Sequence, residues 1–378
     1  MWWNPKLLMR LDFRVIPIIF ALMLISLLVI SSYSEPLNME GESHFFTTTV
    51  LVQIQWFAIG WLLFLFFAGF DYNKLREWTW FLYALMIVLL VGLFFTDPIQ
   101  RVHRWYKVPF IGASLQPSEY AKIAVVITLS WFLERKKHVS DHLSTAFQAF
   151  VITGIPFLLI FKQPDLGTAL VLFPITLVMF YFGGAHPFLV RVMSYLGLVG
   201  VLIIAVIFLN IVPHQTIKPY ALNFLKEYQF DRLDPNTPHQ KAAQTAIAVG
   251  GVFGTGFKKS EFVKGGWLPA PFTDSVFPAF GEEFGLLGLL LILALLFALI
   301  YCSFQVSAVA KDHFGRLLSA GIAVLIAMHV IVNIGMMSGF LPITGVPLTL
   351  ITYGGSSVLS TMTALGVLQS VYSRRFMF

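Results

Sequence analysis

The chain has 378 residues, of which 57% are hydrophobic, 16% are aromatic and only 12% are charged, and its net charge is +6. Soluble domains carry about twice this share of charged residues, so the composition excludes an ordinary soluble domain and indicates a surface solvated largely by lipid. The basic residues are scattered around apolar runs. This argues against nucleic acid as a partner, because a nucleic-acid-binding protein gathers its basic residues on one soluble face.

Apolar runs long enough to cross a bilayer recur along the whole chain. A membrane-spanning helix needs about 20 mostly apolar residues. The sequence predicts ten such helices, over residues 13–33, 47–69, 78–97, 117–133, 145–162, 165–183, 188–212, 276–304, 317–339 and 345–372. The first run follows basic residues, as in a signal peptide, but its length and the spans behind it indicate an uncleaved helix. We therefore expect an all-α polytopic membrane protein that forms one domain over residues 1–378.

The distribution of basic residues predicts how these helices are oriented. If the amino terminus is cytoplasmic, the cytoplasmic segments contain Lys6, Arg10, Arg14, Lys74, Arg76, Arg135, Lys136, Lys137, Arg191, Lys311, Arg316, Arg374 and Arg375. The short outer loops then contain only Arg101, Arg104, Lys107 and Lys162. By the positive-inside rule both termini are cytoplasmic, and one long loop before the eighth helix, about 213–275, lies outside.

This outer loop is too long to be a simple connection between two helices. Its moderately apolar stretch Ala242–Val252 is expected to form short helices along the membrane surface. The glycines between positions 250 and 266 would also suit a phosphate-binding loop. No strand precedes them, as a nucleotide fingerprint requires, so turns between short helices are the favoured interpretation.

Three polar segments are predicted on the outer side, and the first begins with a basic cluster. Arg101, Arg104 and Lys107 surround Trp105, a combination that suits an anionic lipid headgroup. Anchoring of the loop in the membrane interface, where tryptophan is at home, is the alternative.

The same segment continues into a predicted helix that carries a charged pair. Pro117 fits the first turn of this helix, where no amide donor is lost. Glu119 and Lys122 are three residues apart and therefore share a helix face. Charges at the mouth of a membrane helix are costly unless they are paired or hydrated, so the pair is either a structural ion pair or part of a functional site.

The second and third polar segments each centre on an aspartate. Asp165 lies in a predicted hairpin between two spans, and a helix N-cap is favoured for it over catalysis. Asp274 lies where the long loop re-enters the membrane. A carboxylate near an apolar surface can have a raised pKa and act as a general base, but a cap is an equally good interpretation. Glu282 and Glu283 follow as candidates for supporting residues.

The last two predicted spans contain polar and small residues. His329 and Asn333 are four residues apart and should hydrogen-bond to neighbouring helices. The stretch from Pro342 to Ser357 is rich in glycine, proline and serine. Close helix packing through small residues is favoured there over a broken helix that lines a cavity.

Together these segments resemble the SEDS family (shape, elongation, division and sporulation), typified by RodA and FtsW. The matching stretches are His103-Arg-Trp105, Gln116-Pro-Ser-Glu119 with Lys122, Gln163-Pro-Asp-Leu-Gly-Thr168, Thr273-Asp274 with Gly281-Glu-Glu283, Asn333-Ile-Gly-Met336, Pro342-Ile-Thr-Gly345 and Tyr353-Gly-Gly-Ser-Ser357. They follow one another in order over most of the chain, which makes the resemblance specific. The short amino terminus is more similar to RodA than to FtsW.

The resemblance implies a peptidoglycan glycosyltransferase that polymerises lipid II at the outer face of the bacterial cytoplasmic membrane, for cell elongation and shape. One sugar hydroxyl attacks the anomeric carbon of a second unit, and undecaprenyl pyrophosphate leaves. The catalytic aspartate of the family corresponds to Asp274, and its important tryptophan, glutamate and lysine correspond to Trp105, Glu119 and Lys122. The cations of the 101–107 loop and Lys122 would then hold the pyrophosphate.

The resemblance also implies partners. A class B penicillin-binding protein, which is a transpeptidase anchored by one helix, and other proteins of the elongation complex are expected. A divalent cation, Mg²⁺ or Mn²⁺, could neutralise the pyrophosphate, but the sequence contains no ligand cluster with recognisable spacing.

The sequence departs from the family around the aspartate. The family commonly reads Pro-Glu-x-His-Thr-Asp-Phe-Ile-Phe, whereas this chain reads Pro269-Ala-Pro-Phe-Thr-Asp-Ser-Val-Phe277. Ala270, Phe272 and Ser275 thus replace a glutamate, a histidine and a phenylalanine. A scaffold without catalysis therefore stays open as one alternative function. A flippase for lipid-linked precursors is the other alternative. A flippase would need a polar path, often built from inverted repeats, and no such repeat is visible.

Overall fold

The computed structural model describes residues 2–34, 45–96, 103–107, 114–209, 211–222, 230–231 and 233–376, and these are mostly helical. In chain order the elements are η1 (Pro5–Arg10), α1 (Val15–Tyr33), α2 (Thr48–Gly69), α3 (Lys74–Gly92), η2 (Leu93–Phe95), β1 (Tyr106–Lys107), β2 (Ser114–Leu115), α4 (Pro117–Arg135), α5 (Leu143–Lys162), α6 (Leu166–Phe182), α7 (Pro187–Phe208), α8 (His214–Ala221), α10 (Pro238–Gly250), α11 (Val276–Val309), α12 (His313–Met337) and α13 (Gly355–Ser373). The two short strands pair antiparallel, with Tyr106 opposite Leu115.

Each of the ten predicted membrane helices overlaps one of the helices α1–α7 and α11–α13. Among the described residues, seven helices are long and apolar enough to cross a bilayer. A further apolar helix, α6, is 17 residues long. The prediction of a helical polytopic membrane protein is therefore confirmed, whereas the number of ten spans stays a prediction.

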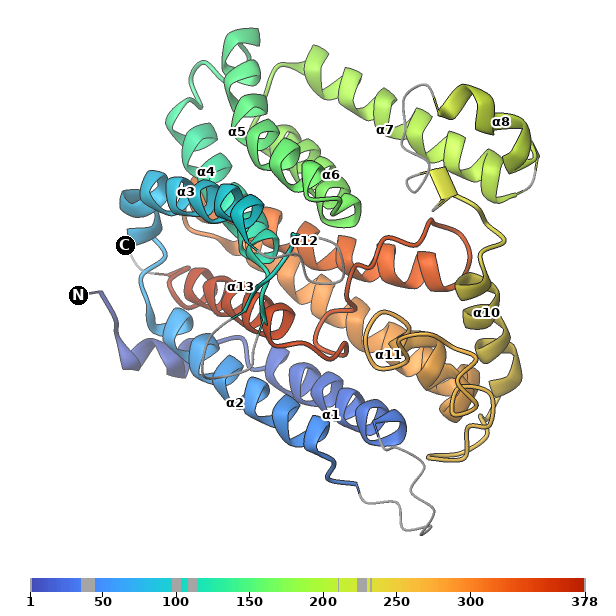
Figure 1. Ribbon diagram of the computed structural model, residues 1–378. Coiled ribbons are helices and arrows are strands. Elements are labelled where there is room, and N and C mark those ends of the chain that lie inside the picture. Colours follow the sequence, from blue (N-terminus) through green and yellow to red (C-terminus); the bar gives the residue numbers. More distant parts are fainter. Residues whose placement is uncertain are drawn as a thin grey trace.

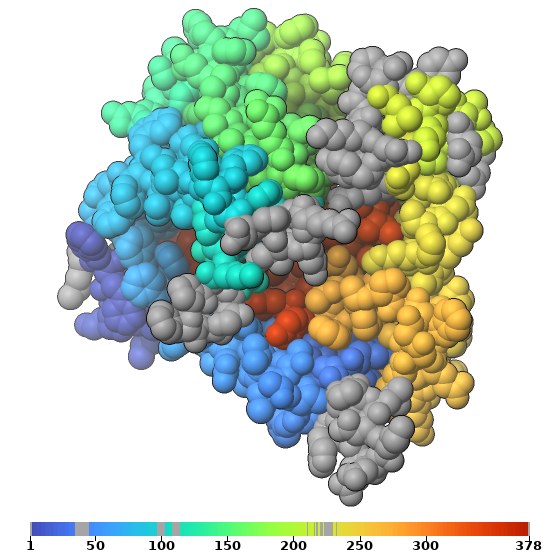
Figure 2. Space-filling model, in the orientation of Figure 1, coloured from blue at the N-terminus to red at the C-terminus, as the bar shows by residue number. Residues whose placement is uncertain are grey.

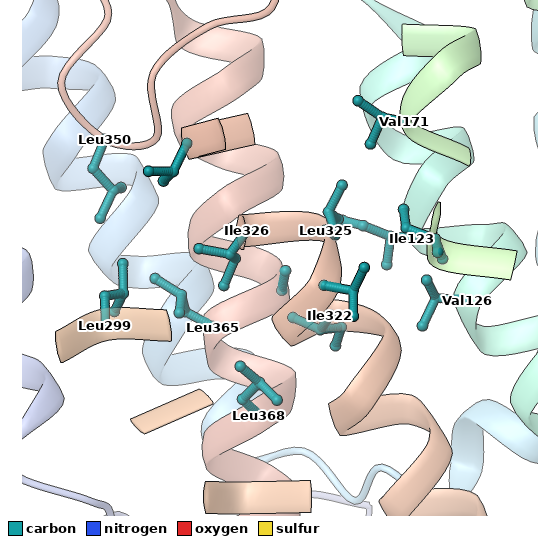
Figure 3. Close-up of a cluster of buried hydrophobic side chains, with 14 of the residues drawn as sticks. Ile123, Val126, Val171, Leu299, Ile322, Leu325, Ile326, Leu350, Leu365 and Leu368 are labelled. Carbon is teal, nitrogen blue, oxygen red and sulfur yellow. The ribbon is translucent and has the colours of Figure 1, made fainter. Parts of the chain in front are cut away.

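The centre of the bundle explains why α4 and α13 do not have the composition of ordinary membrane spans. α12 packs against α4, α6, α11 and α13, and α13 also packs against α2 (Figure 1). Figure 3 shows this centre, where apolar side chains such as Ile123, Leu325 and Leu365 fill the space between α4, α12 and α13. Most residues of α4 and α13 are buried in protein, so these helices can carry polar residues that lipid would exclude.

Small residues bring α2 and α13 into close contact. A methyl group placed on Gly366 would lie 2.7 Å from the backbone oxygen of Phe64. On Gly355 it would lie 2.6 Å from the ring of Trp56. The close helix packing expected for the last span is therefore confirmed for its helical part.

The prediction of a helix over 345–372 is wrong at its start. α13 begins at Gly355, and residues 342–354 contain no helix. Gly345 has φ +75° and Gly354 has φ +155°, values that an α-helix does not allow, and Pro347 removes an amide donor. The broken-helix interpretation therefore applies to this stretch, called here the 342–354 segment.

A second irregularity joins the long outer loop to α11. Gly285 interrupts α11 with φ 62° and ψ −163°. Residues 251–256 lie against this interruption and form four backbone hydrogen bonds with residues 282–287. A methyl group on Gly254 would lie 2.1 Å from the backbone oxygen of Glu283. The glycines of this loop thus form turns that pack on a helix, as the favoured interpretation predicted.

Ion pairs gather at the end of the bundle that carries both chain ends in Figure 1. Arg76 contacts the carboxylates of Glu134 and Asp312 at 3.1 and 2.8 Å. Arg374 lies 3.7 Å from Asp71. These contacts join the ends of α3, α4, α12 and α13, where the basic residues predicted to be cytoplasmic lie. The predicted outer residues lie at the opposite ends of the same helices.

Candidate functional site

An open cavity of about 560 Å³ lies at this opposite end of the bundle. It is formed where the residues before β1, the start of α10, the residues before α11 and the 342–354 segment meet. In Figure 2, atoms of the red carboxy-terminal part are visible from outside between the cyan, orange and yellow segments. The cavity is lined by Arg104, Asp231, Thr237, Pro238, His239, Pro269, Asp274, Ile343, Thr344 and Gly345.

Asp274 is half-buried in the wall of this cavity. Among the described residues, none donates a hydrogen bond to its carboxylate. Burial raises its pKa above the ordinary value, and the nearby charges of His239 and Arg104 partly offset that rise. The cap interpretation is not supported, because α11 begins at Val276 and the residue at its N-cap position is Ser275.

The backbone of Asp274 is held by α12. The side-chain amide of Asn333 donates to the backbone oxygen of Asp274 at 3.1 Å and to that of Val346 at 2.8 Å. The hydroxyl of Thr352 donates to the oxygen of Thr273 at 3.1 Å. One side chain therefore ties the aspartate to the 342–354 segment. The prediction that Asn333 bonds to neighbouring helices is wrong, because both of its partners lie outside helices.

Arg104 brings a positive charge to the same cavity. Its guanidinium donates to the backbone oxygens of Gln163 and Pro164, at the turn between α5 and α6. These contacts fix the arginine on the turn between α5 and α6. Trp105 is half-buried and Lys107 is exposed on β1. Arg101 lies outside the described residues.

Asp165 is a helix cap and a junction. Its carboxylate accepts from the amide of Thr168 at 3.4 Å, at the start of α6. It also accepts from Gln116 and Ser118 at 3.1 Å each. The cap interpretation is thus confirmed, and the residue additionally fastens the start of α4 to α6.

Glu119 and Lys122 form the predicted pair on α4, and α12 adds a third member. The lysine Nζ lies 2.8 Å from Glu119 Oε1 and 2.6 Å from the Nε2 of His329. All three are buried, with 2%, 1% and 3% of their surfaces exposed. None of them lines the cavity around Asp274. The structure therefore gives the pair a place between α4 and α12 and does not bring Lys122 to the site where a pyrophosphate would lie.

Glu282 and Glu283 bond to the outer loop and not to Asp274. Both oxygens of Glu282 accept backbone amides, from Phe262 at 2.9 Å and Val263 at 3.0 Å. Glu283 accepts the amide of Lys258 at 3.0 Å and the hydroxyl of Ser32. These carboxylates hold the outer loop against α11.

His239 is a site residue that the sequence did not single out. It lies in the first turn of α10, after Thr237, which caps that helix. Its Nε2 lies 2.7 Å from the Oγ of Ser275, the residue next to Asp274. The only signal in the sequence was a histidine at the start of a short helix in the outer loop.

Among the described residues, no group of three or more His, Cys, Asp or Glu side chains is arranged to hold a metal ion. The divalent cation thus rests on the resemblance alone.

The sequence of the chain matches one family of known proteins. The model of the FtsW/RodA/SpoVE family of cell cycle proteins matches residues 13–375. The chain is 32% identical to the peptidoglycan glycosyltransferase MrdB of Escherichia coli K12, over 97% of this chain and 95% of that protein. It is also 32% identical to a probable peptidoglycan glycosyltransferase FtsW of Trichlorobacter lovleyi, over 80% of this chain and 77% of that one.

A solved structure shares the fold. It comes from work on the "Structural coordination of polymerization and crosslinking by a peptidoglycan synthase complex". The two chains superpose with a TM-score of 0.75 at 22% identity, over 97% of this chain and 99% of the other.

Proposed function

Because the chain belongs to the FtsW/RodA/SpoVE family of cell cycle proteins, we propose that the cavity around Asp274 is the active site of a peptidoglycan glycosyltransferase. The protein is a multi-pass membrane enzyme that polymerises glycan strands for cell shape. One observation carries the assignment of the site. A half-buried carboxylate with a raised pKa and no described hydrogen-bond donor shares a cavity with a fixed guanidinium.

The reaction assigns a separate task to each of these groups. The acceptor hydroxyl attacks the anomeric carbon of the donor, and its proton passes to the Asp274 carboxylate. The new glycosidic bond forms as the bond from that carbon to the pyrophosphate oxygen breaks. Arg104 stabilises the charge that builds on the leaving pyrophosphate, because a positioned cation acts on the transition state more than on the ground state. A base with a raised pKa suits proton transfer near neutral pH.

Lipid II is the substrate that fits this reaction, and undecaprenyl pyrophosphate is then the leaving group. The outer face of the bacterial cytoplasmic membrane is the proposed location, with both termini inside. The resemblance to RodA favours a role in elongation over division, and the similarity to a peptidoglycan glycosyltransferase covers nearly the whole length of both proteins. A divalent cation, if the reaction uses one, would arrive on the pyrophosphate oxygens, and turnover with and without chelator tests this.

A class B penicillin-binding protein is the proposed partner. The support is the synthase complex whose chain shares this fold, since its description couples polymerisation with crosslinking. Copurification of the two proteins, and stimulation of polymerisation by the partner, would test the proposal. Other elongation-complex proteins would be identified in the same way.

The assignment of Asp274 as base is tested by replacing it with asparagine. The Asp274→Asn change preserves size and shape but removes the base, so polymer formation from lipid II should fall by at least about a hundredfold. The protein should keep its melting temperature in detergent. Near-normal polymer from Asp274→Asn at matched amounts of folded protein would contradict the assignment.

The same assay separates the competing functions. A flippase would move lipid II across vesicles without forming polymer, and a scaffold would do neither. The packed apolar centre below the cavity, around Ile322, Leu325 and Ile326 (Figure 3), offers poor passage to a polar headgroup. Polymer formation is therefore the expected outcome.

A further inference from the structure

The imidazole of His239 occupies a position where it can act on Asp274. Both side chains line the same cavity, and the charge of each affects the ionisation of the other. The ring is fixed by its 2.7 Å contact with the hydroxyl of Ser275. α10, which carries the histidine, packs firmly against α11.

The other ionisable groups around this pair are accounted for. Arg104 and Asp231 share the cavity. On the helices that pack against α10, Glu282 and Glu283 bond to backbone amides of the outer loop, and His329 bonds to Lys122. His239 is thus the histidine among the described residues that faces the aspartate.

Two departures from the family pattern, at positions 272 and 275, are related to the position of His239. Phe272 stands where the pattern carries a histidine, and its ring packs edge-on against Tyr353, with centroids 5.8 Å apart. Ser275 stands where the pattern carries a phenylalanine. A serine leaves room for a ring from α10 and offers it a hydroxyl partner, which a phenylalanine does not.

We propose, on the basis of the active site assigned above, that His239 is the positioning residue of Asp274. Its imidazole extends from α10 and is held by Ser275. It takes the place of the histidine that this chain lacks at position 272, and it favours the ionised form of the catalytic carboxylate.

The direction of the effect follows from the charges. Burial lowers the pKa of His239, and the carboxylate of Asp274 opposes that shift. As the pH falls, the ring becomes protonated, and the resulting cation keeps Asp274 ionised to lower pH. Without the ring, the carboxylate takes up its proton at higher pH, and the base is lost earlier.

The first measurement is the pH profile of polymerisation. In His239→Gln the acidic limb should move to higher pH by about one unit or more, as is typical when an opposite charge nearby is lost. Turnover on the alkaline plateau should change much less. Ser275→Ala should shift the limb in the same direction by less, and His239→Lys, which keeps a cation, should move it back. His138→Gln, in an exposed loop at the opposite end, is the matched control.

The second measurement does not depend on activity. By linkage, the coupling between two groups is reciprocal. The imidazole resonance of His239, identified by its loss in His239→Gln, should titrate at lower pH in Asp274→Asn, with a shift equal in size to that of the acidic limb. An unchanged titration, or an unchanged acidic limb in a folded His239→Gln protein, overturns the proposal.

The outcomes keep this inference separate from the proposed function. If Asp274→Asn is inactive while His239→Gln has the wild-type pH profile, only the positioning role fails. If Asp274→Asn still makes polymer, the assignment of the base fails, and the nuclear magnetic resonance titration alone decides whether the two groups are coupled.

Discussion

At the scale of single residues, burial divides the predicted charged side chains into two groups. Arg104 and Asp274 reach an open cavity, where a substrate could meet them. Glu119 and Lys122 are almost fully buried against each other, so any effect they have on turnover passes through the positions of α4 and α12. The two groups should therefore respond differently to substitution.

Arg104 should show a graded loss of turnover. Arg104→Lys keeps the charge but loses the forked donor geometry of guanidinium, so activity should fall about tenfold. Arg104→Ala removes the charge and should cost about a hundredfold. Lipid II turnover at matched amounts of folded protein is the measurement. Arg191→Ala is the control, since Arg191 is exposed on α7 and donates to its own helix. Wild-type kinetics from Arg104→Ala would refute the role in holding the leaving group.

Lys122 should matter for stability. Lys122→Met leaves the carboxylate of Glu119 buried without its partner, and breaking a buried pair costs about 3–5 kcal/mol. The melting temperature in detergent should fall. The double change Glu119→Gln with Lys122→Met removes both charges and should recover much of that loss. A double variant no more stable than Lys122→Met would show that the unpaired charge of Glu119 is not the main cause of the lost stability.

At the scale of elements, apolar length predicted a helix in each region where the structure has one of α1–α7 and α11–α13, because the need for about 20 apolar residues is set by the bilayer. The 342–354 segment was not identified as non-helical, since its backbone groups are satisfied partly by distant side chains such as Asn333 and Gln53. A local pattern of small and apolar residues does not contain that information.

The candidate site was predicted only in part, because some of its residues are brought together by tertiary contacts that the sequence does not show. Asp274 and Arg104 stand out because charged residues are rare beside membrane helices. His239 does not stand out, because its importance comes from the tertiary contact between α10 and the residue after Asp274. The placement of Lys122 away from the cavity likewise depends on how α4 packs against α12.

The contact between the outer loop and α11 should tolerate no side chain at Gly254. Its φ of +80° and the 2.1 Å approach to Glu283 exclude a methyl group, so Gly254→Ala should lower the melting temperature strongly and reduce the yield of folded protein. Gly154→Ala in α5 is the matched control. A methyl there meets nothing within 4 Å, and alanine favours a helix by about 0.5–1 kcal/mol. Equal stability of both variants would contradict the packing.

At the scale of the whole molecule, the ion pairs around Arg76 and Arg374 support one cytoplasmic end and one outer end. Reporter fusions after Arg135 and after Arg375 should read as cytoplasmic, because basic residues are retained on that side. A fusion within 215–265 should read as external. An external signal from the fusion after Arg135 would contradict the proposed topology.

The backbone joint between residues 251–256 and the interruption at Gly285 has a mechanical consequence. Four hydrogen bonds and a contact too close for any side chain make the outer loop and the start of α11 one stiff unit. Asp274 precedes the helical part of this unit, and Asn333 and Thr352 fasten the backbone around it to α12 and to the 342–354 segment. A force applied to the outer loop would therefore be resisted at the base, and we expect the polymerisation rate to be insensitive to tension on this loop.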